Sequence, residues 1–239
     1  MKKIIIGFVI TLVSLNAVAQ KEIVNDPNVE LREVSGSFDK IKVSGGIELF
    51  LSQSDDVAVA VSASDTKYKD NIKTVVENGT LKIYYFGDKI WNSIKNKNLR
   101  VYVSAKNIES IDLSGASEAQ VAGVITTSSL SLSLSGASQF KGAVNVTDLK
   151  MDLSGASDLT IKGVAKSVSI ESSGASDVKG YELIADNCNA KATGASDISI
   201  TVNKELNARA SGASDISYKG DAVVKEMHAN GASSVGKKS

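Results

Sequence analysis

The tripeptide Gly-Ala-Ser occurs seven times in the second half of the sequence, and this repeat constrains the fold more than any other feature. Successive repeat glycines are 21, 19, 19, 20, 18 and 19 residues apart. A period near 19 residues is typical of one coil of a solenoid, in which each repeat packs only against its neighbours. The glycines are Gly115, Gly136, Gly155, Gly174, Gly194, Gly212 and Gly231.

Apolar and polar residues alternate on both sides of the repeated triplets. Leu130, Leu132 and Leu134 lead into Gly136, for example, and Leu159 and Ile161 follow a later triplet. Alternation with period two predicts half-buried strands. Each period therefore holds at least two short strands joined by a Gly-Ala-Ser corner. We predict an all-β fold, a single-stranded parallel β-helix (solenoid) with coils of about 19 residues.

The residue types at the corner have physical reasons. Glycine permits a left-handed or cramped backbone, alanine fits between stacked corners, and the serine hydroxyl can bond to nearby backbone or to the next serine. A second column of small polar residues precedes the glycines. We interpret both columns as structural ladders. The second column comprises Ser114, Ser135, Ser154, Ser173, Thr193, Ser211 and Asn230.

The chain begins with the layout of a secretory signal peptide. Lys2 and Lys3 precede a short apolar run, and Ala17-Val18-Ala19 is typical of a cleavage site. We expect the mature protein to be exported to the periplasm or cell surface of a bacterium, with no membrane span. The predicted parts are a signal peptide (1–19), a lead-in (20–35), a β-rich part (36–105), a seven-coil β-helix (106–235) and a polar tail (236–239).

The β-rich part lacks the triplet but keeps the strand pattern. Between Thr66 and Val76 the apolar residues share one face of a helix, which predicts one short helix there. Asn78-Gly79 then predicts a tight turn into a strand from Leu81 to Tyr85.

Composition argues against several function classes. Cleavage of the leader removes two lysines and no acidic residue, which leaves a net charge of −2 and no electrostatic case for nucleic acid binding. Cys188 is the only cysteine and lies at an inward position, so we interpret it as a small core residue. His228 is the only histidine. One histidine and one inward cysteine are too few to form a hydrolase triad or a zinc site. We therefore expect no enzyme activity and no cofactor other than calcium.

A column of acidic residues is the one candidate metal site. Asp158, Asp177, Asp197 and Asp215 each stand three residues after a repeat glycine. Stacked one coil apart, their carboxylates would form a ladder suited to calcium. The alternative is that each aspartate caps its own corner in solvent, since repulsion between neighbours in water is only about 1 kcal/mol.

Aromatic residues gather in the β-rich part. Tyr84 and Tyr85 precede a polar segment that contains Trp91. These three residues are candidate ligand-binding residues, because an exposed ring can stack on a sugar. The alternative is that the aromatic side chains cover the open core at the first coil.

Several segments resemble a known family. Val43-Ser44-Gly45-Gly46-Ile47-Glu48-Leu49, Asn78-Gly79-Thr80-Leu81-Lys82-Ile83, Leu99-Arg100-Val101-Tyr102-Val103 and Ile111-Asp112-Leu113-Ser114-Gly115-Ala116-Ser117 occur in that order. Together they resemble exported bacterial proteins described as putative auto-transporter adhesin, head GIN domain, over roughly residues 36 to 235. The resemblance implies a right-handed parallel β-helix and adhesion, and it brings no catalytic residues. No translocator barrel follows the last repeat, so we expect any surface display to use another machine.

These observations predict a non-catalytic envelope or surface protein that binds glycan or another protein along the faces of a rigid β-helix. One alternative is a structural protein that associates with itself, as a homo-oligomer, through exposed strand edges. A second alternative is a polysaccharide lyase-like enzyme, for which Arg209 is the one arginine within the repeats and is expected near the aspartate ladder.

Overall fold

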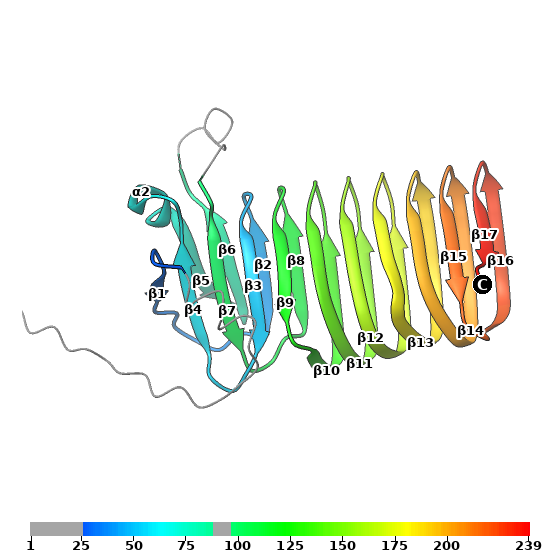
Figure 1. The fold of residues 1–239 in the computed structure, drawn as a ribbon, viewed down its shortest axis with the longest axis horizontal. Coiled ribbons are helices and arrows are strands. Elements are labelled where there is room, and N and C mark those ends of the chain that lie inside the picture. The colour runs from blue at the N-terminus through cyan, green and yellow to red at the C-terminus, as the bar shows by residue number, and fades with distance from the viewer. Residues whose placement is uncertain (1–25, 88–96) are drawn as a thin grey trace, which may run out of the picture.

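The computed structural model describes residues 26–87 and 97–239. The predicted signal peptide, the first residues of the lead-in and Trp91 lie outside this part of the chain. Seventeen strands and one short helix make up the described fold (Figure 1). The elements are β1 (Glu30–Arg32), β2 (Lys40–Ser44), β3 (Glu48–Gln53), β4 (Ala58–Ser62), α2 (Thr66–Lys69), β5 (Ile72–Glu77), β6 (Thr80–Tyr85), β7 (Arg100–Ala105), β8 (Ser110–Ser114), β9 (Glu118–Ala122), β10 (Ile125–Leu134), β11 (Gln139–Leu153), β12 (Asp158–Ser172), β13 (Asp177–Gly194), β14 (Asp197–Gly212), β15 (Asp215–Lys219), β16 (Val223–Gly231) and β17 (Ser234–Lys237).

Each coil of the second half pairs in parallel with the next coil. Leu149 of β11 pairs with Val168 of β12, which pairs with Cys188 of β13, which pairs with Leu206 of β14. Residues one repeat apart therefore lie side by side. The predicted fold class is confirmed: the chain is an all-β solenoid of about seven coils with a spacing near 19 residues.

The coils form two facing sheets that meet at the repeat corners, which Figure 1 shows as a row of narrow tips. We call the strands that lead into each corner the pre-corner sheet; it contains β6, β2, β8, β10, the later parts of β11–β14, and β16. The strands that leave each corner form the post-corner sheet, which contains β7, β3, β9, the earlier parts of β11–β14, β15 and β17. Long strands such as β13 run from one sheet into the other at the rounded end of the coil.

The glycine corners stack directly on one another. The N–H of Ala175 donates to the carbonyl oxygen of Gly155 at 2.7 Å, and Ala156, Ala195, Ala213 and Ala232 make the same bond to the preceding corner. All corner serines except Ser233 are buried. Most corner serines donate their hydroxyl to the carbonyl three residues earlier in the same coil, as Ser157 does to Ser154 at 2.9 Å. The corner serines therefore donate mainly to backbone carbonyls and not to the serine of the next coil, which was the other expected partner.

An additional corner belongs to the same stack. Gly45 and Gly46 both have positive φ, and the N–H of Gly46 donates to the carbonyl oxygen of Gly115 at 3.0 Å. Ile47 takes the place of the corner serine. The stack of corners thus extends one coil into the β-rich part.

The core lies between the two sheets and changes character along the rod. Leu134 and Leu153 are buried at one position of the pre-corner sheet, and Ser172, Ala192 and Ala210 follow them in the next coils. Ser172 is buried but bonded, because its hydroxyl donates to the carbonyl oxygen of Ser176 at 3.2 Å. Cys188 is also buried in this core, as expected from its register.

The first coils are not stacked in chain order. Strands β2 and β3 lie between β6 and β7 on one side and β8 and β9 on the other, with parallel pairing on both sides. After β1, the chain makes β2–β3, then the remaining strands to their left in Figure 1, and then crosses over to continue the rod on the other side.

Antiparallel strands close the N-terminal end. β4 pairs with β7 and β1 pairs with β4, while β5 pairs with β6 through a turn at Asn78-Gly79, where both residues have positive φ. The helix expected from Thr66 to Val76 is wrong in its second half: α2 ends at Lys69 and β5 follows. The β-branched residues of β5 favour a strand, and the open edge of β6 gives it a partner.

Candidate functional site

One outward row of the pre-corner sheet consists of hydroxyl side chains. Its members occupy the position just before each corner glycine, so the parallel register sets them about one strand spacing, roughly 4.8 Å, apart. We call this the hydroxyl row. It comprises Ser114, Ser135, Ser154, Ser173, Thr193 and Ser211.

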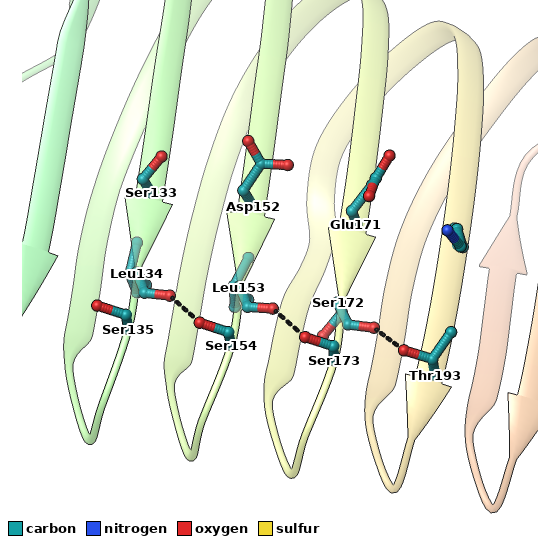
Figure 2. Close-up of a pocket in the computed structure, with 11 residues that line it drawn as sticks. Ser133, Leu134, Ser135, Asp152, Leu153, Ser154, Glu171, Ser172, Ser173 and Thr193 are labelled. Atoms are coloured by element: carbon teal, nitrogen blue, oxygen red, sulfur yellow. Dashed lines mark hydrogen bonds between the residues drawn. The ribbon is translucent and has the colours of Figure 1, made fainter.

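Four of the six hydroxyl groups of this row, those of Ser114, Ser154, Ser173 and Thr193, donate their hydrogen to a backbone carbonyl. Figure 2 shows Ser154, Ser173 and Thr193 each donating to a carbonyl oxygen of the preceding coil, at 3.5, 3.2 and 3.5 Å. A hydroxyl that donates in this way still has lone pairs that can accept. The row therefore presents a line of hydrogen-bond acceptors to a ligand.

A second outward row, two residues earlier, carries charges of both signs. The carboxylate of Asp152 pairs with Lys150 at 2.9 Å, and Glu226 pairs with Arg209 at 2.7 Å and contacts His228 at 3.0 Å. The hydrogen bond from Arg209 lowers the pKa of Glu226, and the hydrogen bond to Asp152 raises the pKa of Lys150. This second row, the charged row, comprises Asp152, Glu171, Lys191, Arg209 and His228.

A shallow groove runs between the two rows. Two hollows of about 380 and 330 Å³ lie along it, and a third of about 230 Å³ lies on the other side of the charged row. Lys191 lines all three. Backbone and the edges of Leu134 and Leu153 contribute to its floor (Figure 2). The groove extends from Ser133 to Asn230, across successive coils. Sequence reasoning recognised the hydroxyl row as a ladder but missed the groove, whose sequence signal is the regular placement of polar residues one and three positions before each glycine.

A larger hollow of about 740 Å³ lies at the corner edge of the first coils. Gly46, Ile47, Leu99 and Gly115 contribute to its lining, and Lys97 places its ammonium 4.5 Å from the centre of the Tyr85 ring. The undescribed residues 88–96 connect the two segments that border this hollow. We therefore assign it no role.

The structure separates the candidate aromatic residues. Tyr85 is half-buried against the core, whereas Tyr84 is 37 % exposed on the outer side of β6. Tyr84 pairs with Ser44, which places it in line with the hydroxyl row, two coils before Ser114. Ligand binding by Tyr84, Tyr85 and Trp91 stays a prediction.

The four aspartates stack in register on the post-corner sheet. Asp158, Asp177, Asp197 and Asp215 pair with one another from coil to coil. Asp158 also pairs with Lys179 at 3.0 Å, and Asp215 accepts from the hydroxyl of Ser234 at 2.6 Å. Within residues 26–87 and 97–239, no three His, Cys, Asp or Glu side chains meet closely enough to hold a metal ion. Calcium binding by this ladder, and capping of each corner by its own aspartate, stay the two alternatives.

Residues with catalytic chemistry are scattered. Arg209 leads into a corner on the pre-corner sheet and pairs with Glu226, whereas the aspartates follow the corners on the opposite sheet. The expected nearness of Arg209 to the aspartates, on which the lyase alternative rested, is therefore wrong. Burial raises the pKa of the Cys188 thiol to about 12, so that this thiol is a poor nucleophile.

Stacked parallel coils with polar outer faces define the protein as a β-solenoid. The chain belongs to the family described as putative auto-transporter adhesin, head GIN domain, whose model matches residues 37–222. This membership confirms the resemblance seen in the sequence and points to an exported or surface protein.

Solved structures share the fold. A putative adhesin from Bacteroides fragilis is 18% identical, with a TM-score of 0.82 over 88% of this chain and 96% of that one. A putative lipid binding protein from Parabacteroides distasonis is 20% identical, with a TM-score of 0.70 over 90% and 98% of the two chains. A putative adhesin from the same species is 20% identical, with a TM-score of 0.71 over 88% and 97%. At this identity, the likeness shows the fold alone.

Comparison with curated proteins finds no match. Among the described residues, no helix is long and apolar enough to cross a membrane.

Proposed function

We propose that the protein is an exported, non-catalytic protein of the cell envelope or surface that binds an extended partner, a glycan or a protein, along the pre-corner sheet. The observation that carries the proposal is the groove between the hydroxyl row and the charged row. It crosses successive coils in nearly constant geometry, so that an elongated partner can repeat one contact along the rod. Family membership and the adhesin names of similar structures support the same role.

Self-association is the structural alternative. Strands β16 and β17 each pair with a strand on one side only, and Val223 and Met227 of β16 are exposed. Unpaired strand edges of this kind invite association with another copy. The lipid-binding name of one similar structure adds a third class of partner, which the binding experiment includes.

The test is a binding survey with the mature protein from residue 20. Immobilised glycans, purified surface proteins and lipid vesicles are presented to labelled protein, and light scattering over a range of concentrations reports self-association. We expect saturable binding to a glycan or a protein by a species that scatters as a monomer. Absence of binding to every glycan and protein, or light scattering that rises steeply with protein concentration, would contradict the proposal. Release of ultraviolet-absorbing unsaturated sugars would instead favour the lyase alternative.

A further inference from the structure

We propose that the groove selects a linear, uncharged polysaccharide that lies along the rod and is held by the hydroxyl row. This inference rests on the proposed function and narrows it in two ways, to one class of ligand and to one wall of the groove. Three features of the groove support it: the direction of its hydrogen bonds, the balance of its charges and its repeat.

The hydrogen bonds of the hydroxyl row suit a ligand rich in donors. Ser154, Ser173 and Thr193 each give their hydrogen to a backbone carbonyl, so that their oxygens remain as acceptors. A neutral polysaccharide carries several hydroxyl donors on every sugar. Its hydroxyl groups can donate to successive oxygens of the row without leaving a buried polar group unpaired.

Charges in the groove largely cancel one another. Lys150 pairs with Asp152 and Arg209 pairs with Glu226, both inside or beside the groove. Glu171 and Lys191, which face each other in register, add one charge of each sign. A groove with this balance has no net field that would attract a polyanion or a polycation. An uncharged ligand also leaves these ion pairs intact.

The residues that line the groove disfavour a protein partner. Protein interfaces are centred on buried aromatic or large apolar anchors, and an extended peptide pairs with the edge of a sheet rather than with its outer face. Here the walls are Ser, Thr and charged side chains, and none of the exposed large apolar residues of the described chain lines the three hollows. A chain of repeated sugars fits the in-register repeat of the row.

Tyr84 extends this line at its N-terminal end. Tyr84 is 37 % exposed and pairs with Ser44, which pairs in turn with Ser114, the first residue of the row. A sugar ring has an apolar face that can stack on an aromatic side chain. Tyr84 thus adds one stacking contact to a row that otherwise offers only hydrogen bonds.

The test compares two triple variants of the mature protein. Ser154→Ala, Ser173→Ala and Thr193→Val together remove three oxygens of the row with little change in shape. Ser199→Ala, Ser217→Ala and Thr160→Val make the same chemical changes on the post-corner sheet. The probes are cellulose-derived oligosaccharides, glucomannan and pullulan as neutral chains, and hyaluronan, polygalacturonate and chitosan as charged ones. Thermal unfolding checks that both variants fold.

We expect a neutral chain to bind, the groove variant to bind it about tenfold to a hundredfold more weakly, and the control variant to bind it as the parent does. Equal binding by all three proteins would overturn the inference, because the row would then take no part. Binding of charged polymers or surface proteins with no neutral polysaccharide would overturn it while leaving the proposed function standing. Absence of binding to any partner would overturn both.

Discussion

The backbone leaves no room for a side chain at the last five repeat glycines, from Gly155 to Gly231. A β-carbon on Gly155, which has a φ of +80°, would lie 2.5 Å from the carbonyl oxygen of Gly136 in the neighbouring coil. Gly123 has the same φ of +80°, but a β-carbon there would meet nothing within 4 Å. Comparison of these two glycines therefore distinguishes the strain of the backbone conformation, which both share, from the clash with a neighbouring coil, which only Gly155 has.

We predict that Gly155→Ala destabilises the protein far more than Gly123→Ala. The second substitution adds only the strain of a left-handed alanine, about 1 to 2 kcal/mol. The first adds a clash with backbone that cannot move independently, and we expect a further loss of about 1 to 3 kcal/mol. Urea unfolding of the two variants measures the difference. Equal losses would mean that the corners do not constrain each other.

Single residues also set the limits of prediction from sequence. The seven triplets predicted the stack because Gly, Ala and Ser each meet a constraint of the corner. The corner at Gly45-Gly46 was missed, because Ile47 replaces the serine and a second glycine replaces the alanine. Ile47 is buried, which shows that an apolar side chain can fill the same space in the first coils. The groove was missed because it depends on two rows whose spacing only the coordinates give.

At the scale of elements, the carboxylate of Asp26 connects the residues just before β1 to β7. Asp26 accepts from the hydroxyl of Tyr102 at 3.0 Å and lies 3.8 Å from Arg100. Burial by itself raises the pKa of Asp26, but hydrogen bonds from Ser62, Asn28 and Tyr102 and the charge of Arg100 lower it below its ordinary 3.8. Burial and the bond to Asp26 also raise the pKa of Tyr102 to about 12.

We predict that Asp26→Asn lowers the free energy of unfolding by about 1 to 3 kcal/mol at neutral pH. Because the pKa of Asp26 is depressed in the folded state, its stabilisation is complete above 3.8 and is lost as the pH falls through the folded-state value. The gap between parent and variant should therefore close in acid. Urea unfolding at neutral and acid pH tests this, with Asp221→Asn, a change at a carboxylate that is 98% exposed, as the control. A gap that persists in acid would contradict the assignment.

Charge determines the behaviour of the aspartate ladder. Lys179 and Ser234 already partner its two outer members, and each neighbouring pair repels by about 1 kcal/mol in water. We therefore expect calcium and chelators to leave the melting temperature unchanged, and Asp177→Asn with Asp197→Asn to raise it slightly. A melting temperature that rises with calcium in the parent, and not in this double variant, would instead establish an ion in the ladder.

The helix error also belongs to this scale. Tyr68, Ile72, Val75 and Val76 share a helical face, but α2 stops at Lys69 because β5 pairs with β6 along its whole length. Local periodicity could not show that an open strand edge would be beside this segment. Tertiary pairing therefore decided between two conformations that the sequence allows.

For the whole molecule, protection from hydrogen exchange should follow position in the rod rather than position in the chain. Each coil is held by its neighbours, so coils with two neighbours open less often than a terminal coil. We predict slow exchange in β2 and β3, which are paired on both sides, and fast exchange in β16 and β17, which are paired on one. Mass spectrometry of exchanged peptides measures both. Faster exchange in β2 and β3 than in β16 and β17 would contradict the order of strands.

The insertion of β2–β3 between later strands has a consequence for how the protein is assembled during synthesis. A rod built in chain order could add each coil as it appeared. Here the first coil, β2–β3, has only one of its two neighbours, β6 and β7, until β8 and β9 have been made through Ala122. We therefore expect β1 to β9 to assemble as one nucleus, after which each later coil can pair with the coil before it.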